Sequence, residues 1–178
     1  MLTSLLLLAL PLQARTFAGV TLPDTASVGG QTVTLNGMGL REKFFVDVYV
    51  GGLYLTTPTH DANTAITVDQ PKRVVMHFVY STVTHDQMIE SFEEQFAGLP
   101  SVAAQKPNID KMYAWVPAEL HRGDEIVFDY VPGAGTSMVV KGKTMGTLAG
   151  TDFMKMLFSV YLGPKPPTEA LKNGLLGT

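Results

Sequence analysis

Segments with the pattern of β-strands follow one another along this chain instead of alternating regularly with helices, and this order constrains the fold more than any other feature. Alternating apolar and polar residues indicate a half-buried strand, whereas apolar residues at intervals of three and four indicate an amphipathic helix. The pattern predicts strands at 16–22, 31–35, 40–55, 72–80, 124–131, 136–141 and 144–148, and helices at 60–66, 85–97, part of 101–115, 151–161 and 167–173. Neighbouring strands favour an α+β protein, in which helices pack on one side of an antiparallel sheet, over a parallel doubly wound fold.

Three local signals fix the ends of elements. Thr84 stands three residues before Gln87, which is the capping-box pattern of a helix start. The sequence Pro-Gly-Ala-Gly at 132–135 predicts a turn between two strands. Gly174 is predicted to end the last helix as its C-cap.

Composition excludes several classes of function. A chain of 178 residues is long enough for one domain with a sizeable core, and its 46% hydrophobic residues against 16% charged residues are typical of a globular protein. The net charge of −3 argues against a nucleic-acid partner, because phosphate binding needs a basic surface. The chain has no cysteine and its four histidines show no metal-ligand spacing, so we expect neither a metal nor a redox cofactor.

The first fourteen residues, MLTSLLLLALPLQA, resemble a secretory signal peptide with cleavage after Ala14. Their apolar run, Leu5 to Leu10, is shorter than the roughly 20 residues that a membrane-spanning helix needs. We therefore expect an exported protein, periplasmic or secreted, with a single domain at 15–178, no integral membrane segment after cleavage, and a monomeric state. A mis-started N-terminus or a buried first strand remains the alternative.

Arg41 and Tyr49 stand out in the segment GLREKFFVDVYVGGLYL, residues 39–55, because they share the parity of its apolar residues. On a straight strand they would face the same side but lie about 26 Å apart. They can share one ligand only if the chain turns between them, around 42–45. The alternatives are an ion pair of Arg41 with Glu42 or Asp47, and a core role for Tyr49.

The same segment resembles the signature segment of the chalcone isomerase-like superfamily. The run SVYLGPKPPTEALKNGLLG at 159–177 resembles that family's closing segment, and residues 123–153 resemble its bacterial branch. The resemblance implies an open-faced β-sandwich, which is a large antiparallel sheet with a layer of helices over one face. It also implies that a ligand cleft lies between the sheet and the helices.

The plant enzymes of this superfamily close a chalcone to a flavanone with a strand arginine, a strand threonine, a helix tyrosine, a helix asparagine and a hydroxyl residue near the C-terminus. By this resemblance the arginine corresponds to Arg41, and the other four positions fall at Tyr49, Met88, Gln95 and Val160. Met88 and Val160 cannot donate a hydrogen bond to an oxyanion. Since loss of one such donor can cost about 10²–10³ in rate, we expect little chalcone cyclisation, and Arg41 is the one catalytic candidate.

The fatty-acid-binding branch of the superfamily also resembles this stretch, through its Val-Tyr-Ala-x-Gly-Leu-Tyr pattern against residues 48–54. In that branch the arginine and the tyrosine hold the ligand's carboxylate, which implies this role for Arg41 and Tyr49. Met88, Phe92 and Gln95 recur at helical spacing, so one face of the predicted helix at 85–97 would form the opposite wall of the cleft. The predicted ligand-binding residues are Arg41, Tyr49, Met88, Phe92, Gln95 and Val160.

Three functions follow from these observations. The leading hypothesis is an exported, non-catalytic protein that binds a small apolar ligand such as a fatty acid or another carboxylate. The second is an isomerase that acts on an unidentified enone or phenol. The third is a structural or interaction protein of the cell envelope, with its cleft filled by side chains.

Overall fold

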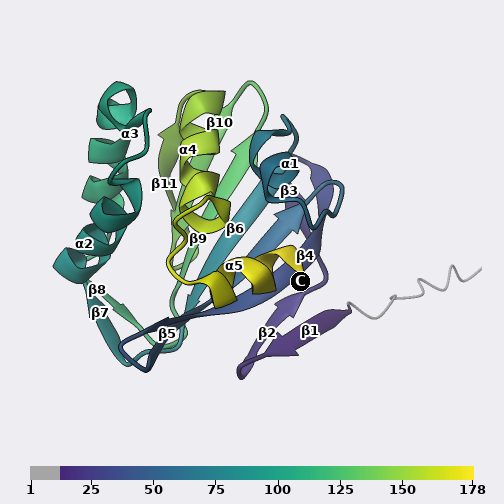
Figure 1. Cartoon of the computed structure of the whole chain (residues 1–178), viewed down its shortest axis with the longest axis vertical. Coiled ribbons are helices and arrows are strands. Elements are labelled where there is room, and N and C mark those ends of the chain that lie inside the picture. The colour runs from purple at the N-terminus through teal and green to yellow at the C-terminus, as the bar shows by residue number, and fades with distance from the viewer. Residues whose placement is uncertain (1–12) are drawn as a thin grey trace, which may run out of the picture.

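A computed structural model describes residues 13–178, and it confirms the α+β class with one large antiparallel sheet (Figure 1). Seven strands form this sheet in the order β11-β10-β9-β6-β5-β4-β3, and two small two-stranded sheets, the β1–β2 hairpin and the pair β7–β8, stand apart from it. The strands are β1 (Ala14–Phe17), β2 (Val20–Pro23), β3 (Thr25–Val28), β4 (Gln31–Lys43), β5 (Val46–Leu55), β6 (Lys72–Phe78), β7 (Thr82–Thr84), β8 (Glu119–His121), β9 (Glu125–Val131), β10 (Gly135–Val140) and β11 (Lys143–Leu148). The helices are α1 (Ala62–Thr67), α2 (His85–Phe96), α3 (Val102–Trp115), α4 (Thr151–Leu162) and α5 (Glu169–Leu176).

The helices lie over one face of the sheet, as Figure 1 shows, and the main core fills the space between the two layers. Helix α4 runs through the middle of this layer, and eight of its twelve residues are buried. Alternate residues of the central strands, such as Met76 and Phe128, meet Phe153 and Leu157 of this helix in the same apolar cluster. This arrangement is the sheet with a one-sided helical layer that the resemblance implied.

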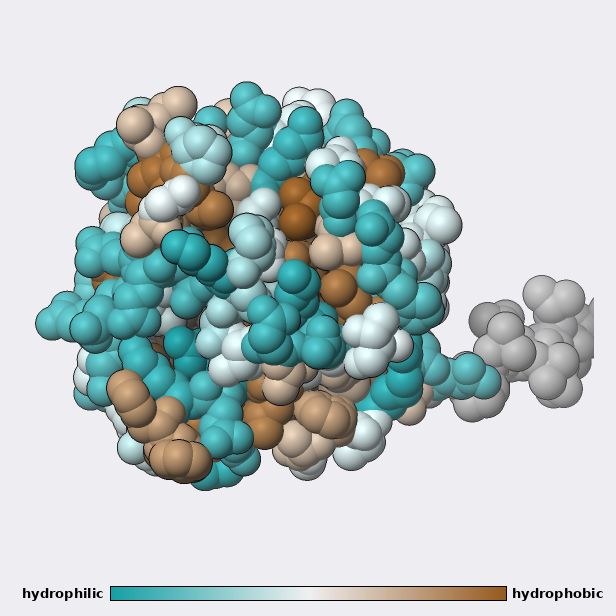
Figure 2. Space-filling view, in the orientation of Figure 1, coloured by the Kyte–Doolittle hydropathy of each residue, from teal (hydrophilic) through white to brown (hydrophobic). Residues whose placement is uncertain are grey.

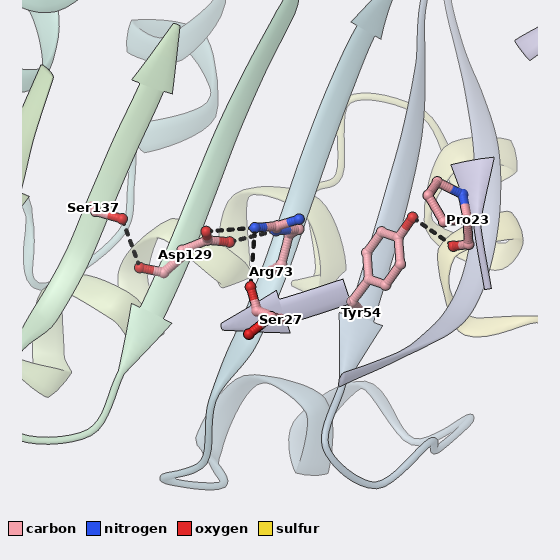
Figure 3. Close-up of polar contacts among 6 residues, drawn as sticks. All are labelled: Pro23, Ser27, Tyr54, Arg73, Asp129 and Ser137. Carbon is pink, nitrogen blue, oxygen red and sulfur yellow. Dashed lines mark hydrogen bonds and ion pairs between the residues drawn. The ribbon is translucent and has the colours of Figure 1, made fainter. Parts of the chain in front are cut away.

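The opposite face of the sheet carries a second, smaller apolar cluster that includes Leu22, Val50 and Val75. Polar contacts border it (Figure 3): the Tyr54 hydroxyl donates to the carbonyl of Pro23 at 2.9 Å, and the Arg73 guanidinium binds both carboxylate oxygens of Asp129 at 2.5 and 2.7 Å. The N-terminal hairpin is therefore held against this face.

Helix α5 lies directly against the backbone of β4. A Cβ atom at Gly39 would lie 2.4 Å from the carbonyl oxygen of Leu171, and one at Gly174 would lie 2.4 Å from that of Met38. Real Cβ atoms do not approach so closely, so glycine at both positions lets the helix sit on the strand. The glycine of the Gly-x-Arg pattern thus seats the helical layer two residues from Arg41.

Most predicted elements are present within a few residues, and the capping box of Thr84 and Gln87 is confirmed. The prediction of one strand at 16–22 is wrong, because this segment is a hairpin with a two-residue turn at 18–19. The long strand predicted at 40–55, with a bend allowed within it, reverses completely and is a hairpin with its turn at 44–45. The prediction for Gly174 is also wrong, since α5 continues to Leu176 and ends at Gly177 with φ of 71°. Strands β3, β7 and β8 were not predicted.

None of the helices within residues 13–178 is long and apolar enough to cross a membrane. The described part of the chain also contains no group of three acidic or histidine side chains placed to hold a metal ion. The predicted signal peptide falls on residues 1–12, outside the described residues, except for its last two positions, of which Ala14 begins β1.

Candidate functional site

The β4–β5 hairpin places Arg41 opposite Tyr49, although they are eight positions apart in the sequence. Residues 44–45 form the turn that joins the two strands. This turn lies within 42–45, the region where a ligand site shared by the two residues needs the chain to reverse. Between the pairs Glu42–Asp47 and Arg41–Tyr49 the register shifts, so that Val48 is an extra residue on β5. Such a β-bulge re-aims the side chains beside it. Both Arg41 and Tyr49 therefore line one cleft on the helical side of the sheet.

This cleft has a volume of about 460 Å³, within the usual range for small-molecule sites. Its walls come from the β4–β5 hairpin, the end of β6 with the residues that follow it, and one side of α2. The lining residues are Arg41, Lys43, Phe44, Val46, Val48, Tyr49, Phe78, Tyr80, Val83, Gln87, Met88, Glu90, Ser91 and Glu94. The cleft thus combines apolar walls with a few polar groups.

Arg41 is the exceptional residue of the cleft, because its guanidinium is buried without a carboxylate partner. The side chain is only 4% exposed, and its one side-chain hydrogen bond within residues 13–178 runs from Nη2 to Ser91 Oγ at 3.3 Å. No ion pair among the described residues includes it. The pairing with Glu42 or Asp47 that the sequence left open is not formed. A buried charge is costly unless it is paired, so this site favours an anion.

Tyr49 supplies a neutral hydroxyl next to this charge. It is 3% exposed, and its ring packs against Phe78 with centroids 5.8 Å apart. Burial raises the pKa of Tyr49 well above its usual value, and the charge of Arg41 opposes this only in part. The hydroxyls of Tyr54, Tyr130 and Tyr161 find acceptors within residues 13–178, whereas that of Tyr49 does not. Tyr49 is therefore a hydrogen-bond donor left available at the cleft.

Of the predicted ligand-binding residues, the structure brings Arg41, Tyr49 and Met88 together in the cleft. Phe92 lies in the core, with ring centroids 6.0 Å from Phe96 and 6.4 Å from Phe128. Val160 is also a core residue, at 2% exposed, and Gln95 is half-buried outside the cleft lining. The spacing 88, 92, 95 identifies the face of α2 that packs on the sheet, whereas the flank at 87, 91 and 94 borders the cleft.

Sequence reasoning missed most of the other lining residues, and two of the missed residues of this region interact with Arg41 or Tyr49: Ser91 and Tyr161. Ser91 follows Met88 by three positions and so lies beside it on the helix surface, which was a usable signal. Tyr161 was missed because it follows Val160 in a largely apolar helix, where no pattern distinguishes it from the core residues. Its hydroxyl contacts Met76 Sδ at 3.2 Å, and burial together with Tyr49 raises its pKa, whereas Arg41 lowers it. Tyr161 thus stands behind the pair formed by Arg41 and Tyr49.

Charges at the rim of the cleft are mixed. Lys43 Nζ lies 3.4 Å from Glu94 Oε2, and Glu90 is exposed beside them. Because both members of the Lys43–Glu94 pair are substantially exposed, solvent screens their attraction. The buried guanidinium is therefore the dominant charge inside the cleft.

A second hollow, of about 320 Å³, contains the buried Lys72 and has a structural explanation. Lys72 Nζ donates to the carbonyl oxygens of Ala65 at 2.7 Å and Ile66 at 3.3 Å, near the end of α1. It also lies 5.4 Å from the ring centroid of Phe158. Burial lowers the pKa of Lys72 to about 8. This lysine closes the end of a helix, and the cleft at Arg41 remains the candidate site.

Comparisons with known proteins agree with this architecture. The crystal structure of a fatty-acid binding protein from Arabidopsis thaliana superposes with a TM-score of 0.70 at 14% sequence identity, over 92% of this chain and 96% of that one. This likeness shows a shared fold. No curated protein matches the chain. A family model described as chalcone isomerase-like matches residues 14–177. The chain therefore belongs to the chalcone isomerase-like family.

Proposed function

We propose that this protein binds a small apolar ligand with a carboxylate group, such as a fatty acid, and that it is not a chalcone isomerase. The observation that carries the proposal is the buried Arg41 guanidinium, which faces a ligand-sized cleft and has no acidic partner within residues 13–178. A ligand carboxylate would supply the missing anion. The fatty-acid binding protein from Arabidopsis thaliana, which shares the fold, supports this choice of ligand class.

The polar groups of the cleft suit a carboxylate. The guanidinium presents several N–H donors in a planar fork that matches two carboxylate oxygens. The Tyr49 hydroxyl adds a neutral donor, because its raised pKa keeps the proton in place at neutral pH. Val48, Phe78 and Met88 surround the tail of the ligand with apolar surface.

The same residues argue against cyclisation of a chalcone. That reaction needs donors that stabilise a phenolate and a developing enolate. Met88 lies in the cleft but has only a thioether, and Val160 lies in the core. Measured turnover of a chalcone panel above the uncatalysed rate, abolished by Arg41→Met, would overturn this part of the proposal.

Export belongs to the proposal as well. We propose that residues 1–14 are a signal peptide cleaved near Ala14 and that residues 15–178 act as a monomer in the periplasm or outside the cell. The apolar N-terminal sequence supports this. The intact mass of the protein recovered from the exported fraction tests it: we expect a chain that starts at Arg15, and an uncleaved chain that stays in the cytoplasm would contradict it.

Calorimetric titration of the delipidated protein with a fatty acid and with the alcohol of the same chain length tests the ligand class. We expect the acid to bind at least about tenfold more tightly, since hydrogen bonds to charged groups contribute about 1.5–3 kcal/mol. Arg41→Met should remove this preference. Lys43→Met is the matched control, because it removes a cation from the same strand and cleft but from the exposed rim. Equal affinity for acid and alcohol would refute the proposal.

A further inference from the structure

The turn between β4 and β5 exposes two adjacent aromatic rings beside the cleft. Phe44 is 85% exposed and Phe45 is 97% exposed. The other exposed large apolar residues in residues 13–178 are Phe17, Val46, Val68 and Tyr80. Isolated exposed apolar residues are ordinary, but contiguous apolar patches mark interaction sites. The question is therefore whether these residues are scattered or gathered.

All of them except Val68 gather at one end of the molecule. Phe44, Val46 and Tyr80 line the proposed ligand cleft, and Phe45 with Val46 and Tyr80 borders a third hollow, separate from the one at Lys72. The turn that follows Phe17 borders this third hollow too. Figure 1 places the ends of the β4–β5 and β1–β2 hairpins together at the bottom of the view, and Figure 2 shows apolar groups at the surface there.

The backbone of this turn gives an independent sign of selection for aromatic residues. Both Phe44 and Phe45 have positive φ, at 51° and 63°, which is unusual for bulky residues. Two-residue turns of this kind normally use glycine. The chain follows that rule at its three other two-residue hairpin turns, which are Ala18-Gly19, Gly29-Gly30 and Lys141-Gly142. Only the turn beside the cleft carries two phenylalanines in place of a residue that the backbone prefers.

We propose that this aromatic tip, residues 44–46 with Tyr80, docks on the surface of a lipid bilayer and opens the ligand cleft toward it. A protruding tip is too small for a stable protein interface, which buries about 800 Å² per partner, but aromatic rings suit the membrane interface. The charges nearby select the lipid. Within residues 13–178, exposed Glu42 and Asp47 flank Lys43, and Arg122 borders the hollow beside Phe45, so the charges around the tip are mixed and form no basic cluster that would attract anionic headgroups. The partner is therefore a zwitterionic surface.

The docking proposal rests on the proposed function only for the identity of the ligand. That ligand is a carboxylate with an apolar tail, which the protein takes up from the bilayer. Phe44, Val46 and Tyr80 belong both to the exposed tip and to the cleft lining. A ligand could therefore pass from the membrane into the cleft along a continuous apolar path, and its carboxylate would meet Arg41 at the buried end.

Phe45→Gly is the sharpest test, because Phe45 does not line the ligand cleft and the resulting turn matches the Gly-containing turns elsewhere in the chain. Co-sedimentation of the full chain with phosphatidylcholine vesicles should show a partition coefficient about tenfold lower for this variant. Its stability and its affinity for a fatty acid in solution should be unchanged or higher. Val68→Asn is the matched control, since it removes an exposed apolar residue outside the tip and should leave partition unchanged.

A local probe makes the test independent of the N-terminal residues. The chain has a single tryptophan, so Phe45→Trp adds one fluorophore at the tip. Vesicles should shift its emission to the blue, and lipids with brominated acyl chains should quench it. Neither effect should depend strongly on salt. The absence of both effects, or a partition that Phe45→Gly leaves unchanged, would overturn the proposal.

Two further outcomes separate the alternatives. Self-association of the wild-type chain that Phe45→Gly abolishes, seen by analytical ultracentrifugation, would identify the tip as a contact between copies and would overturn membrane docking. Arg41→Met should keep vesicle binding although it loses the carboxylate. Failure of the docking proposal and failure of the proposed function are therefore distinguishable.

Discussion

Replacement of Arg41 by methionine should stabilise the ligand-free protein. The guanidinium is 4% exposed and makes one 3.3 Å hydrogen bond within residues 13–178, so its desolvation is poorly compensated. Replacing buried ionic groups with apolar side chains of similar size is neutral or stabilises proteins by about 1–4 kcal/mol. Because this guanidinium borders a cleft that water can enter, we expect the lower part of that range, about 1–2 kcal/mol. For a chain of this size that raises Tm by about 2–8 °C.

Ligand should offset most or all of this difference. At a fatty-acid concentration of 100 times the wild-type Kd, the wild-type protein gains about 2.7 kcal/mol, whereas Arg41→Met, which binds about tenfold more weakly, gains about 1.4 kcal/mol. Urea unfolding of delipidated proteins, with and without the acid, measures both effects. If delipidated Arg41→Met is less stable than the wild type by more than about 1 kcal/mol, Arg41 has a structural role and the reasoning is refuted.

Three other changes test separate parts of the structure. Tyr49→Phe should keep the fold and weaken fatty-acid binding about 2- to 10-fold, as loss of one hydrogen bond predicts; unchanged affinity in a calorimetric titration would remove Tyr49 from the site. Gly39→Ala should lower the free energy of unfolding by about 1–3 kcal/mol, because the new Cβ would meet α5 2.4 Å from the carbonyl of Leu171; an unaffected urea midpoint would show that α5 shifts freely. Lys72→Met should abolish a rise in stability between about pH 8 and 10.5. In the folded protein the pKa of Lys72 is lowered to about 8, so across this window the unfolded chain binds more protons and the free energy of unfolding increases with pH. A wild-type pH profile of stability in the variant would contradict the pKa shift.

The order of most elements was readable from the sequence because the longer strands and the helices carry their own period of apolar residues. Strands β3, β7 and β8 have only three or four residues, too few to show a period, and the segments 16–22 and 40–55 were misjudged at their turns. Residues 18–19 and 44–45 interrupt neither run with a polar cluster or a proline, so the sequence pattern shows no break at them. Backbone twist and pairing decide where such a chain reverses, and neither is visible in the period of a single segment.

The candidate site was predictable in part. Arg41 and Tyr49 were recognisable because they share the parity of the apolar residues in their segment and because that segment resembles the fatty-acid-binding branch; the β4–β5 turn then brings them opposite each other. Met88 was found because it belongs both to the buried face of α2 and to its cleft-facing flank. Phe92 and Val160 follow the apolar period, and that period marks the core and not the cleft. The position of Tyr161 behind Tyr49 depends on how α4 packs on the sheet, which no local pattern specifies.

The most direct test of carboxylate recognition by Arg41 is the NMR titration of a fatty acid labelled with ¹³C at its carboxyl group and bound to the protein. An arginine next to a carboxylate lowers its pKa by about 1–3 units. We predict that the bound carboxyl stays ionised well below the pH at which the free acid is protonated, and that Arg41→Met removes this difference. A bound carboxyl whose pKa equals or exceeds that of the free acid would contradict the central claim.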